Sequence, residues 1–428
     1  MKPMTLPRMS IASLLGLSIT FASAVAPAPA SASDSRVLTL SYNNARYKDF
    51  FETTARLFEA ENPEAHITTL PPVATEGEHL TRTFRLAVTG ELPDVSFNGY
   101  SHVAIMARRG LAVPLDRFIA DEKDWAESGL TPASMEATKV RGATYALPLE
   151  SSTPTLFFNK DLVRRAGGDP DHLPPDWDGI IELAVKIHGL GNNIIGGFFD
   201  YNASGNWTYQ AMVTGLGGHL MNEDDTKIEF NDSKGRRALD IIRRIGQTGM
   251  IDMSQDQAFQ AFSAGQMGMI TQSNTFLAKF EEDSKGRFEI QTMKWPLVAP
   301  EGRVPIGGRG IMMYTTDPKK QKIVWQYMKF MTTPKIQTLL VQMLSSTPAN
   351  TIAIKQPEYL GKYYNDHPNE QIAVGALPFV TGWYAFPGDN APRIVDAIRD
   401  HTRDVAINKA GVDEALSAMS NSVKKLLP

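Results

Sequence analysis

Cysteine is absent from the 428 residues of this chain, and that single absence removes several kinds of chemistry. Without cysteine the protein forms no disulfide bonds, builds no thiolate metal site and has no thiol nucleophile. An exported chain would also lack the cysteine to which a lipid anchor is attached. We therefore expect a protein that is free of the membrane.

Recognisable catalytic motifs are lacking as well. The sequence holds no G-x-S-x-G elbow, P-loop, H-E-x-x-H pair or dinucleotide fingerprint. The eight histidines show no ligand spacing, and Asn222-Glu223-Asp224-Asp225 is more typical of a solvated turn than of a calcium loop. We expect no catalytic residue, no metal and no cofactor. Paired carboxylates for glycoside hydrolysis stay open, although no pair stands out.

Clusters of basic residues are also missing. The formal net charge is -4, and lysine and arginine are spread along the chain. This distribution argues against nucleic acid as a partner. Charged residues make up 21% and hydrophobic residues 42% of the chain, which is typical of a globular protein.

The N-terminus has the pattern of an export signal. Lys2 and Arg8 give a positive start, 11–24 is a short apolar run, and Ala30-Ser31-Ala32 fits the small-residue cleavage rule. We predict a signal peptide over 1–32, and a retained membrane anchor is the less favoured alternative because the apolar run is short. The periplasm is the expected compartment, with the mature chain at a net charge of -6, since the leader holds two basic and no acidic residues.

Strands and helices alternate in the segment that follows. Strands are predicted at 37–42, 66–70 and 93–97, with helices between them that end at Asn62-Pro63 and at Gly90. This order is typical of a parallel α/β sheet, in which ligands bind at the carboxyl ends of the strands. Asn43, Asn44, Asn98, Gly99 and Tyr100 are therefore expected on one rim.

The segment 146–177 divides the chain. Glu150, Ser151 and Ser152 lie in an extended stretch, Thr155–Phe158 reads as a buried strand, and Asn159-Lys160-Asp161 opens a helix. A second α/β unit follows, with strands expected at 193–199 and 228–230 and a short strand within 267–280, before a loop and a new helix. Helices are expected from Trp207 to Leu216, after Asn231, from about Arg393, and over 410–427.

Several motifs carry a resemblance to a known family. They are SSTPTLFFNKDLVRRAGGDP with PPDW, ARLFEAENP, GELPDVSFNGYSHV, and the stretch from Phe262 to Asn274. Together they resemble the extracellular solute-binding proteins of ATP-driven (ABC) importers, nearest the glycerol-3-phosphate- and sugar-binding branch. The resemblance extends over essentially the whole mature chain.

The resemblance implies a two-lobed α/β fold of the periplasmic-binding-protein type (type II-like). Each lobe would be a mostly parallel sheet flanked by helices and discontinuous in sequence. The N-terminal lobe would comprise 33–147 and 308–346, and the C-terminal lobe 148–307 and 347–428. The chain would cross between the lobes near Pro148, near Gly307-Gly308 and near Thr347-Pro348.

Candidate ligand-binding residues are hydrogen-bonding and aromatic side chains at loop ends, where capping or turn roles are the alternative. They are Asn43, Asn44, Tyr100, Ser151, Ser152, Asn206, Trp207, Asn274, Gly308, Arg309, Trp383 and Tyr384. Trp207 matches in position a tryptophan of the glycerol-3-phosphate binders, whereas Ser204 stands at the place of their other loop tryptophan.

Charge bears on the ligand class. Arg309 is the main candidate for a phosphate contact, but Phe386-Pro387-Gly388 occupies the stretch where the phosphate binders carry a second arginine. We therefore predict a monomeric periplasmic binding protein that captures a carbohydrate or a sugar or glycerol derivative and delivers it to ABC permease subunits of the inner membrane. A phosphate or carboxylate on the ligand stays open. The alternatives are a secreted glycan-active enzyme and a binding protein that serves a chemoreceptor.

Overall fold

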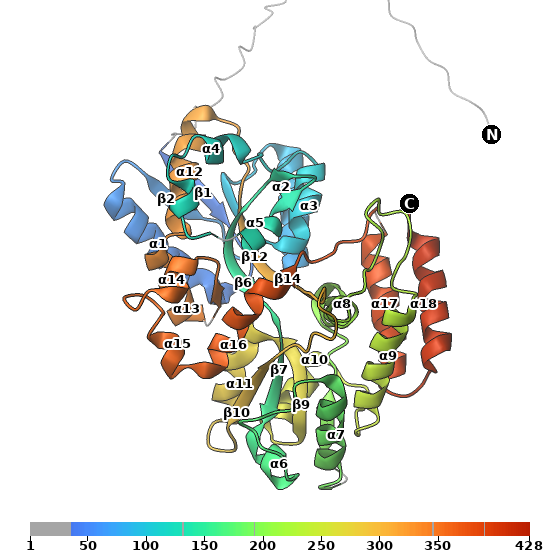
Figure 1. The fold of residues 1–428 in the computed structure, drawn as a ribbon. Coiled ribbons are helices and arrows are strands. Elements are labelled where there is room, and N and C mark those ends of the chain that lie inside the picture. The colour runs from blue at the N-terminus through green and yellow to red at the C-terminus, as the bar shows by residue number, and fades with distance from the viewer. Residues whose placement is uncertain (1–35, 131, 192, 345, 389) are drawn as a thin grey trace, which may run out of the picture. The chain divides into compact units, whose positions relative to one another are not determined.

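The computed structural model describes residues 36–428 except 131, 192, 345 and 389, so the predicted signal peptide lies outside the described residues. Two sheets organise this part of the chain (Figure 1). The first sheet has six strands in the order β13 (Thr347–Pro348), β6 (Leu147–Ser152), β12 (Gly307–Met313), β3 (Val95–Gly99), β1 (Val37–Ser41) and β2 (His66–Thr69).

Five long helices pack around the first sheet. They are α1 (Lys48–Glu61), α2 (Glu76–Thr89), α3 (Tyr100–Arg108), α12 (Pro318–Met331) and α13 (Pro334–Leu344). In α1 the spacing of Phe50, Phe51 and Phe58 puts all three rings on one face, where they are buried. Gly90 ends α2 in the left-handed conformation, as the sequence predicts. Shorter elements are α4 (Asp116–Ala120), α5 (Pro132–Glu136) and the hairpin β4 (Lys139–Val140) to β5 (Ala143–Thr144).

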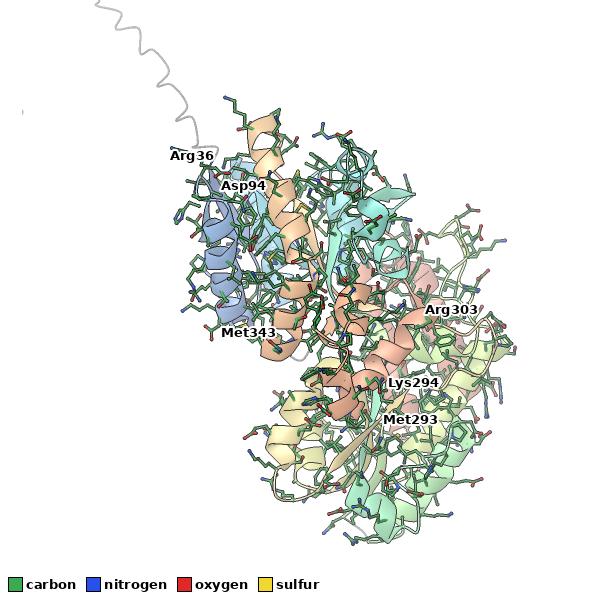
Figure 2. The ribbon with its side chains drawn as sticks, turned by 60° about the vertical axis from the view of Figure 1, so that its left-hand side comes forward. Arg36, Asp94, Met293, Lys294, Arg303 and Met343 are labelled. Carbon is green, nitrogen blue, oxygen red and sulfur yellow. The ribbon has the colours of Figure 1, made fainter. Side chains whose placement is uncertain are left out.

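A buried ion pair fastens this sheet to α12. Asp94, the last residue of the motif GELPD, receives hydrogen bonds from Lys320 Nζ and from the backbone N–H of Thr39, both at 2.9 Å. Both charged side chains are about nine-tenths buried, and Asp94 lies directly before β3 (Figure 2). The aspartate of this motif therefore has a structural role.

The second sheet has four strands in the order β10 (Ile290–Lys294), β7 (Pro154–Asn159), β9 (Met267–Ser273) and β8 (Ile195–Phe198). Its apolar run Leu156-Phe157-Phe158 is fully buried, as predicted. The helices packed around it are α6 (Lys160–Arg165), α7 (Trp177–His188), α8 (Trp207–Gly215), α9 (Ser233–Gly246), α10 (Gln255–Ser263) and α11 (Leu277–Ser284).

The C-terminal segment joins the second core. After β13 come α14 (Thr351–Lys355), α15 (Tyr363–Asp366), α16 (Pro368–Ala376) and β14 (Val380–Thr381), which pairs with β11 (Val304–Pro305). The last helices, α17 (Ala391–Ala406) and α18 (Val412–Leu426), pack against each other and against α9, and they bury Ile394, Ile398 and Met419 in the core of the second sheet. Figure 1 shows this helical group in red beside α9.

Strand direction is mixed in both sheets. The fold is α/β as predicted, and most strands of each sheet point the same way, whereas β12 and β13 in the first sheet and β7 in the second run opposite to their neighbours. Parallel pairing is found for β1–β2, β1–β3 and β8–β9, whereas β12–β3, β12–β6, β13–β6, β10–β7 and β7–β9 are antiparallel. The reason is that β12 enters the first sheet at the edge where β1, β3 and β6 end, and so runs the opposite way.

One local prediction needs correction. The strand expected at 228–230 is an isolated bridge between Met221 and Ile228. The first sheet includes all of β6 and β13, so it extends to Ser152 and Pro348. None of the helices in the described residues is long and apolar enough to cross a membrane.

Candidate functional site

A cavity of about 540 Å³ lies where strand ends of the two sheets meet, and we call it the cleft cavity. The first sheet reaches it through the residues after β1, the end of β6 and the start of β12. The second sheet reaches it through the end of β9, the start of α10, and the loop and helix that follow β8. Because strand ends leave backbone and side chains free of the sheet, this edge is suited to binding a ligand.

The structure brings seven of the predicted site residues to this cavity. They are Asn43, Asn44, Ser152, Trp207, Gly308, Arg309 and Trp383. Asn43 is 3% exposed, and its side-chain oxygen has no hydrogen-bond partner among the described residues. A buried acceptor without a donor is costly, so Asn43 is suited to receive a hydrogen bond from a ligand.

Arg309 is held by acidic and phenolic groups. Its Nη1 donates to Glu150 Oε1 at 2.9 Å and to the Tyr47 hydroxyl, while Nη2 lies 3.5 Å from Glu76 Oε1. The guanidinium carbon also sits 4.4 Å from the centre of the Tyr47 ring. The side chain of Arg309 is 13% exposed and that of Glu150 only 4%. The main candidate for a phosphate contact is thus already paired.

Glu150 is a fully satisfied carboxylate. Tyr47 Oη donates to Oε1 at 2.7 Å, and Ser346 Oγ donates to Oε2 at 2.6 Å. Burial by itself would raise the pKa of Glu150, but Arg309 and Arg46 with the two hydroxyl donors outweigh burial and lower it. Glu150 therefore stays ionised and ties β6, β12 and the segment before β13 together.

Gly308 makes this close packing possible. Its φ is +123°, and an added Cβ would lie 2.1 Å from the backbone oxygen of Glu150. The β12–β6 register also shifts between Arg309 and Gly310. This irregularity turns the start of β12 onto β6, so that Arg309 reaches Glu150.

Aromatic side chains form the wall on the side of the second sheet. The rings of Trp207 and Trp383 have centroids 6.1 Å apart and planes inclined at 47°. Trp207 is buried and donates from Nε1 to the backbone oxygen of Pro305 at 3.1 Å, whereas Trp383 is half-buried. A Cβ at Gly205 would lie 2.7 Å from the Trp383 ring, so glycine is needed there to let the indole approach.

Five predicted site residues do not line the cleft cavity. Tyr100 Oη donates to the backbone oxygen of Glu150 at 2.9 Å, and Tyr384 Oη donates to Asp225 at 2.7 Å. Asn274 accepts from the Thr153 N–H at 2.8 Å and donates to Thr347 Oγ1 at 2.9 Å, so it links two segments that pass between the sheets. Ser151 and Asn206 are buried, at 0% and 2% exposed. Tyr100 and Tyr384 line, with Trp383, a separate cavity of about 650 Å³.

Other lining residues were not singled out from the sequence. They are Arg46, Tyr47, Thr75, Glu76, Gly77, Glu150, Gln255, Gln272, Thr275 and Phe276, among others. Glu150 lies beside the predicted residues Ser151 and Ser152 in the crossover. It was not selected, because the candidates were chosen for amide, hydroxyl and aromatic side chains. Glu76 and Gln255 are first residues of helices, where an exposed capping role is the usual expectation.

A buried carboxylate stands behind the wall formed by the second sheet. Asp200 is 0% exposed; Gln255 Nε2 and Gln272 Nε2 donate to its Oδ2 at 2.7 and 2.5 Å, and the Asn202 N–H donates to Oδ1 at 2.9 Å. Burial raises the pKa of Asp200 to about 6, against the lowering effect of these hydrogen bonds.

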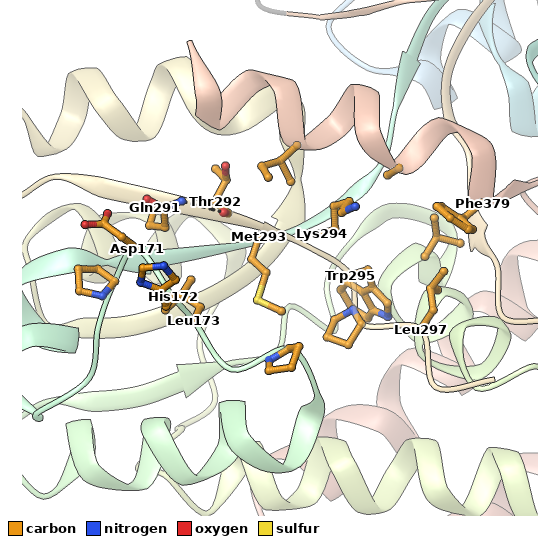
Figure 3. A pocket seen from close by; sticks show the side chains of 16 residues that line it. Asp171, His172, Leu173, Gln291, Thr292, Met293, Lys294, Trp295, Leu297 and Phe379 are labelled. Atoms are coloured by element: carbon orange, nitrogen blue, oxygen red, sulfur yellow. Dashed lines mark hydrogen bonds between the residues drawn. The ribbon is translucent and has the colours of Figure 1, made fainter. Parts of the chain in front are cut away.

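A further cavity of about 580 Å³ lies along the edge strand β10, where Figure 3 shows Met293, Trp295, Leu297 and Phe379 around it. Apolar side chains from the loop at 170–175, from β10 and the segment 295–297 that follows it, and from α16 and Phe379 supply most of its lining. None of its described lining residues belongs to the first sheet. The polar and charged groups expected for a solute site are gathered in the cleft cavity.

Comparison with known proteins places these features in a family. A profile described as bacterial extracellular solute-binding protein matches residues 42–338. The chain belongs to this family. The sn-glycerol-3-phosphate-binding periplasmic protein UgpB of Pectobacterium atrosepticum is 24% identical over 294 residues, which span 65% of this chain and 65% of that relative. The protein of the same name from Escherichia coli is 23% identical over 397 residues, 88% of this chain and 89% of that one.

Solved structures show the same fold for this member of the family. The cyclic alpha-maltosyl-1,6-maltose binding protein from Arthrobacter globiformis has a TM-score of 0.78 at 19% identity, covering 91% of this chain and 98% of that chain. UgpB from Mycobacterium tuberculosis, in complex with glycerophosphocholine, has the same TM-score at 17% identity and the same coverage. The predicted α/β fold of the two-lobed solute-binding proteins is confirmed.

Proposed function

We propose that this solute-binding protein captures a neutral, polyhydroxylated ligand of the carbohydrate class in the cleft cavity. The observation that carries the proposal is the pairing of Arg309 with Glu150 and Glu76. Two arginines and two glutamates line the cavity, so their formal charges sum to zero. A phosphate would have to displace a buried carboxylate from Arg309, whereas sugar hydroxyls use both signs of this network as donors and acceptors.

The aromatic wall supports the same ligand class. Trp207, Trp383 and Phe276 present apolar faces beside the polar network, and the C–H faces of sugar rings pack on such surfaces while their hydroxyls bond in the ring plane. Several relatives are named for sugars or glycerol phosphates, including a receptor complexed with acarbose and a protein bound with alpha-D-tagatose. These names support a carbohydrate or a sugar or glycerol derivative.

Lobes that close around the ligand complete the proposed mechanism. We propose that 33–147 with 308–346 form one lobe and 148–307 with 347–428 the other, within a few residues. The three segments between the sheets would act as the hinge, and ligand contacts to both sheets would favour a closed state. ABC permease subunits would receive the ligand from the closed form.

We propose that residues 1–32 direct export, that the mature chain is a periplasmic monomer without a lipid anchor, and that binding occurs without catalysis. Incubation with maltotetraose followed by product chromatography tests the last point, since turnover would favour a glycan-active enzyme.

A thermal-shift panel tests the ligand class. The mature chain would be heated with maltose, maltotetraose, tagatose, glycerol, sn-glycerol 3-phosphate and glycerophosphocholine. A ligand that binds only the folded state raises the unfolding midpoint by several degrees when it is present well above its Kd. We expect shifts with neutral sugars that exceed those with either phosphate compound. Shifts confined to the phosphate compounds would overturn the neutral-ligand proposal.

A further inference from the structure

The buried Asp200 holds two glutamine side chains by hydrogen bonds. Asp200 follows β8, Gln255 begins α10, and Gln272 lies on β9, so the three come from different elements. Both glutamines line the cleft cavity, whereas Asp200 does not. The carboxylate is thus separated from the ligand space by the amides that donate to it.

An ionised carboxylate only accepts hydrogen bonds, and this fixes how the amides are turned. Gln255 and Gln272 must both direct Nε2 at Asp200, because the reverse orientation would bring an amide oxygen against Oδ2. Gln272 Oε1 is occupied by the backbone N–H of Ser273 at 2.8 Å. Gln255 Oε1 receives no hydrogen bond from any described residue, and Gln255 is half-buried at the cavity wall.

We propose that Asp200 is a positioning residue that fixes the Gln255 amide so that its Oε1 accepts a hydrogen bond from a hydroxyl group of the ligand. The inference rests on the proposed function and adds a specificity rule to it. The wall formed by the second sheet demands a donor from the ligand. A phosphate or carboxylate oxygen at this position would meet another acceptor and be repelled.

The two sides of the cavity therefore require different hydrogen-bonding groups from a ligand. On the side of the first sheet, Arg46 and Arg309 supply donors close to the acceptors Glu76 and Glu150. On the side of the second sheet, the amide held by Asp200 supplies an acceptor, and Trp207 and Trp383 belong to the same cavity lining. A ring with hydroxyls along its edge satisfies both sides, whereas an anionic end group is excluded from the second.

Protonation of Asp200 offers a readout that a purely structural residue would not share. The groups that contact its carboxylate in the described chain are the amides of Gln255 and Gln272 and the backbone N–H of Asn202, none of which titrates. A protonated Asp200 becomes a donor and no longer requires both Nε2 groups. Affinity for a neutral sugar should therefore fall as the pH drops below about 6.

A double-mutant cycle tests the inference by isothermal titration calorimetry. The titrant is the neutral sugar of the panel that gives the largest thermal shift with the native chain. At pH 7.5 we expect Asp200→Asn and Gln255→Met each to weaken binding about three- to tenfold. If Asp200 acts through Gln255, Asp200→Asn should cost nothing further in the Gln255→Met background. Asp252→Asn is the matched control, because this exposed carboxylate accepts from Tyr201 and lies outside the cavity lining.

Failure of the role assigned to Asp200 and failure of neutral-sugar binding give different results. The inference alone would be overturned if Asp200→Asn lowered the sugar affinity by the same factor in the native chain and in the Gln255→Met variant. It would also be overturned if the Asp200→Asn variant lost affinity with falling pH just as the native chain does. Native affinity for Gln255→Met would do the same, and that arm does not depend on whether Asp200→Asn folds. If the native chain binds no neutral sugar of the panel, the proposed function fails and the inference falls with it.

Discussion

Arg309 and Glu150, 159 residues apart in the chain, form an ion pair of 2.9 Å across the neighbouring strands β12 and β6. The pair lies at the edge of the first sheet, in the lining of the cleft cavity, and close to two of the segments that pass between the sheets. It therefore links the ligand site to the connections on which any closure of the lobes would depend.

Removing the arginine should destabilise the fold. Arg309→Met leaves the buried Glu150 with two hydroxyl donors but without the cation that donates a hydrogen bond to it, and loss of one partner of a buried pair costs about 3–5 kcal/mol. We expect a decrease of that order in the free energy of unfolding at pH 7, measured with urea. The double variant Arg309→Met with Glu150→Gln should recover most of the loss, because the deeply buried carboxylate charge is then gone as well.

Arg46→Met is the matched control for this prediction. Arg46 also lines the cavity but is exposed, so its removal should change the free energy of unfolding by less than about 0.5 kcal/mol. Equal stability of the Arg309→Met variant and the native chain would contradict the claim that Arg309 compensates Glu150.

The buried His79 should lower the free energy of unfolding in mild acid. The ring is 1% exposed and its Nε2 lies 3.1 Å from Ser41 Oγ; burial, with smaller effects of Arg82, His102 and Arg309, lowers its pKa to about 3. Below pH 6.5 the unfolded chain takes up a proton that the folded chain refuses, so stability falls as the pH falls. Between pH 6.5 and 4 this contribution is on the order of 3 kcal/mol.

Urea unfolding at several pH values measures this contribution. His79→Gln, whose amide can still reach the serine hydroxyls, should show a shallower decline than the native chain over the same range. Asp200, whose pKa is raised, contributes with the opposite sign between about pH 4 and 6, so the comparison must be between variant and native chain. If the free energy of unfolding fell equally with pH in the variant and in the native chain, His79 would not be the cause of the acid destabilisation.

The sequence predicted the fold better than it predicted the site. An apolar run such as Leu156–Phe158 predicts a buried strand, and a glycine such as Gly90 predicts the end of a helix. Both patterns depend on only a few neighbouring residues. The antiparallel direction of β12 depends on how the chain returns from the second sheet to the first. No short sequence pattern predicts that long-range connection.

The candidate site divides in the same way. Asn43 follows a strand, and the rule that ligands bind at strand ends selected it, whereas Trp207 was selected by its place in a loop after a strand and by the family resemblance. Asn274 also ends a strand, yet it holds Thr153 and Thr347 at the crossing segments, which only the fold brings together. The pairing of Arg309 with Glu150 and of Asp200 with its glutamines likewise joins residues far apart in the chain.

Trp383 should contribute to ligand binding more than to stability. It is half-buried at the cavity wall, so Trp383→Ala removes an aromatic face from the ligand space while leaving the buried Trp207 in place. We expect about a tenfold loss of affinity for the best neutral sugar, measured by calorimetry. Trp125→Ala is the control, since Trp125 is also half-buried but packs on Trp325 away from the cavity. Unchanged affinity in the Trp383 variant would remove this ring from the site.

Gly308 gives the sharpest test of how the site is built. Its φ of +123° disfavours any side chain, and a Cβ would lie 2.1 Å from the Glu150 backbone oxygen, so Gly308→Ala must push β12 away from β6. We expect a loss of at least about 2 kcal/mol in the free energy of unfolding, together with weaker ligand binding because Arg309 is displaced. Gly382→Ala is the control, since an added Cβ there meets no atom within 4 Å. A Gly308→Ala variant as stable as the Gly382→Ala variant would show that β12 tolerates a side chain at this point. The close contact between the two strands would then not be what holds Arg309 against Glu150.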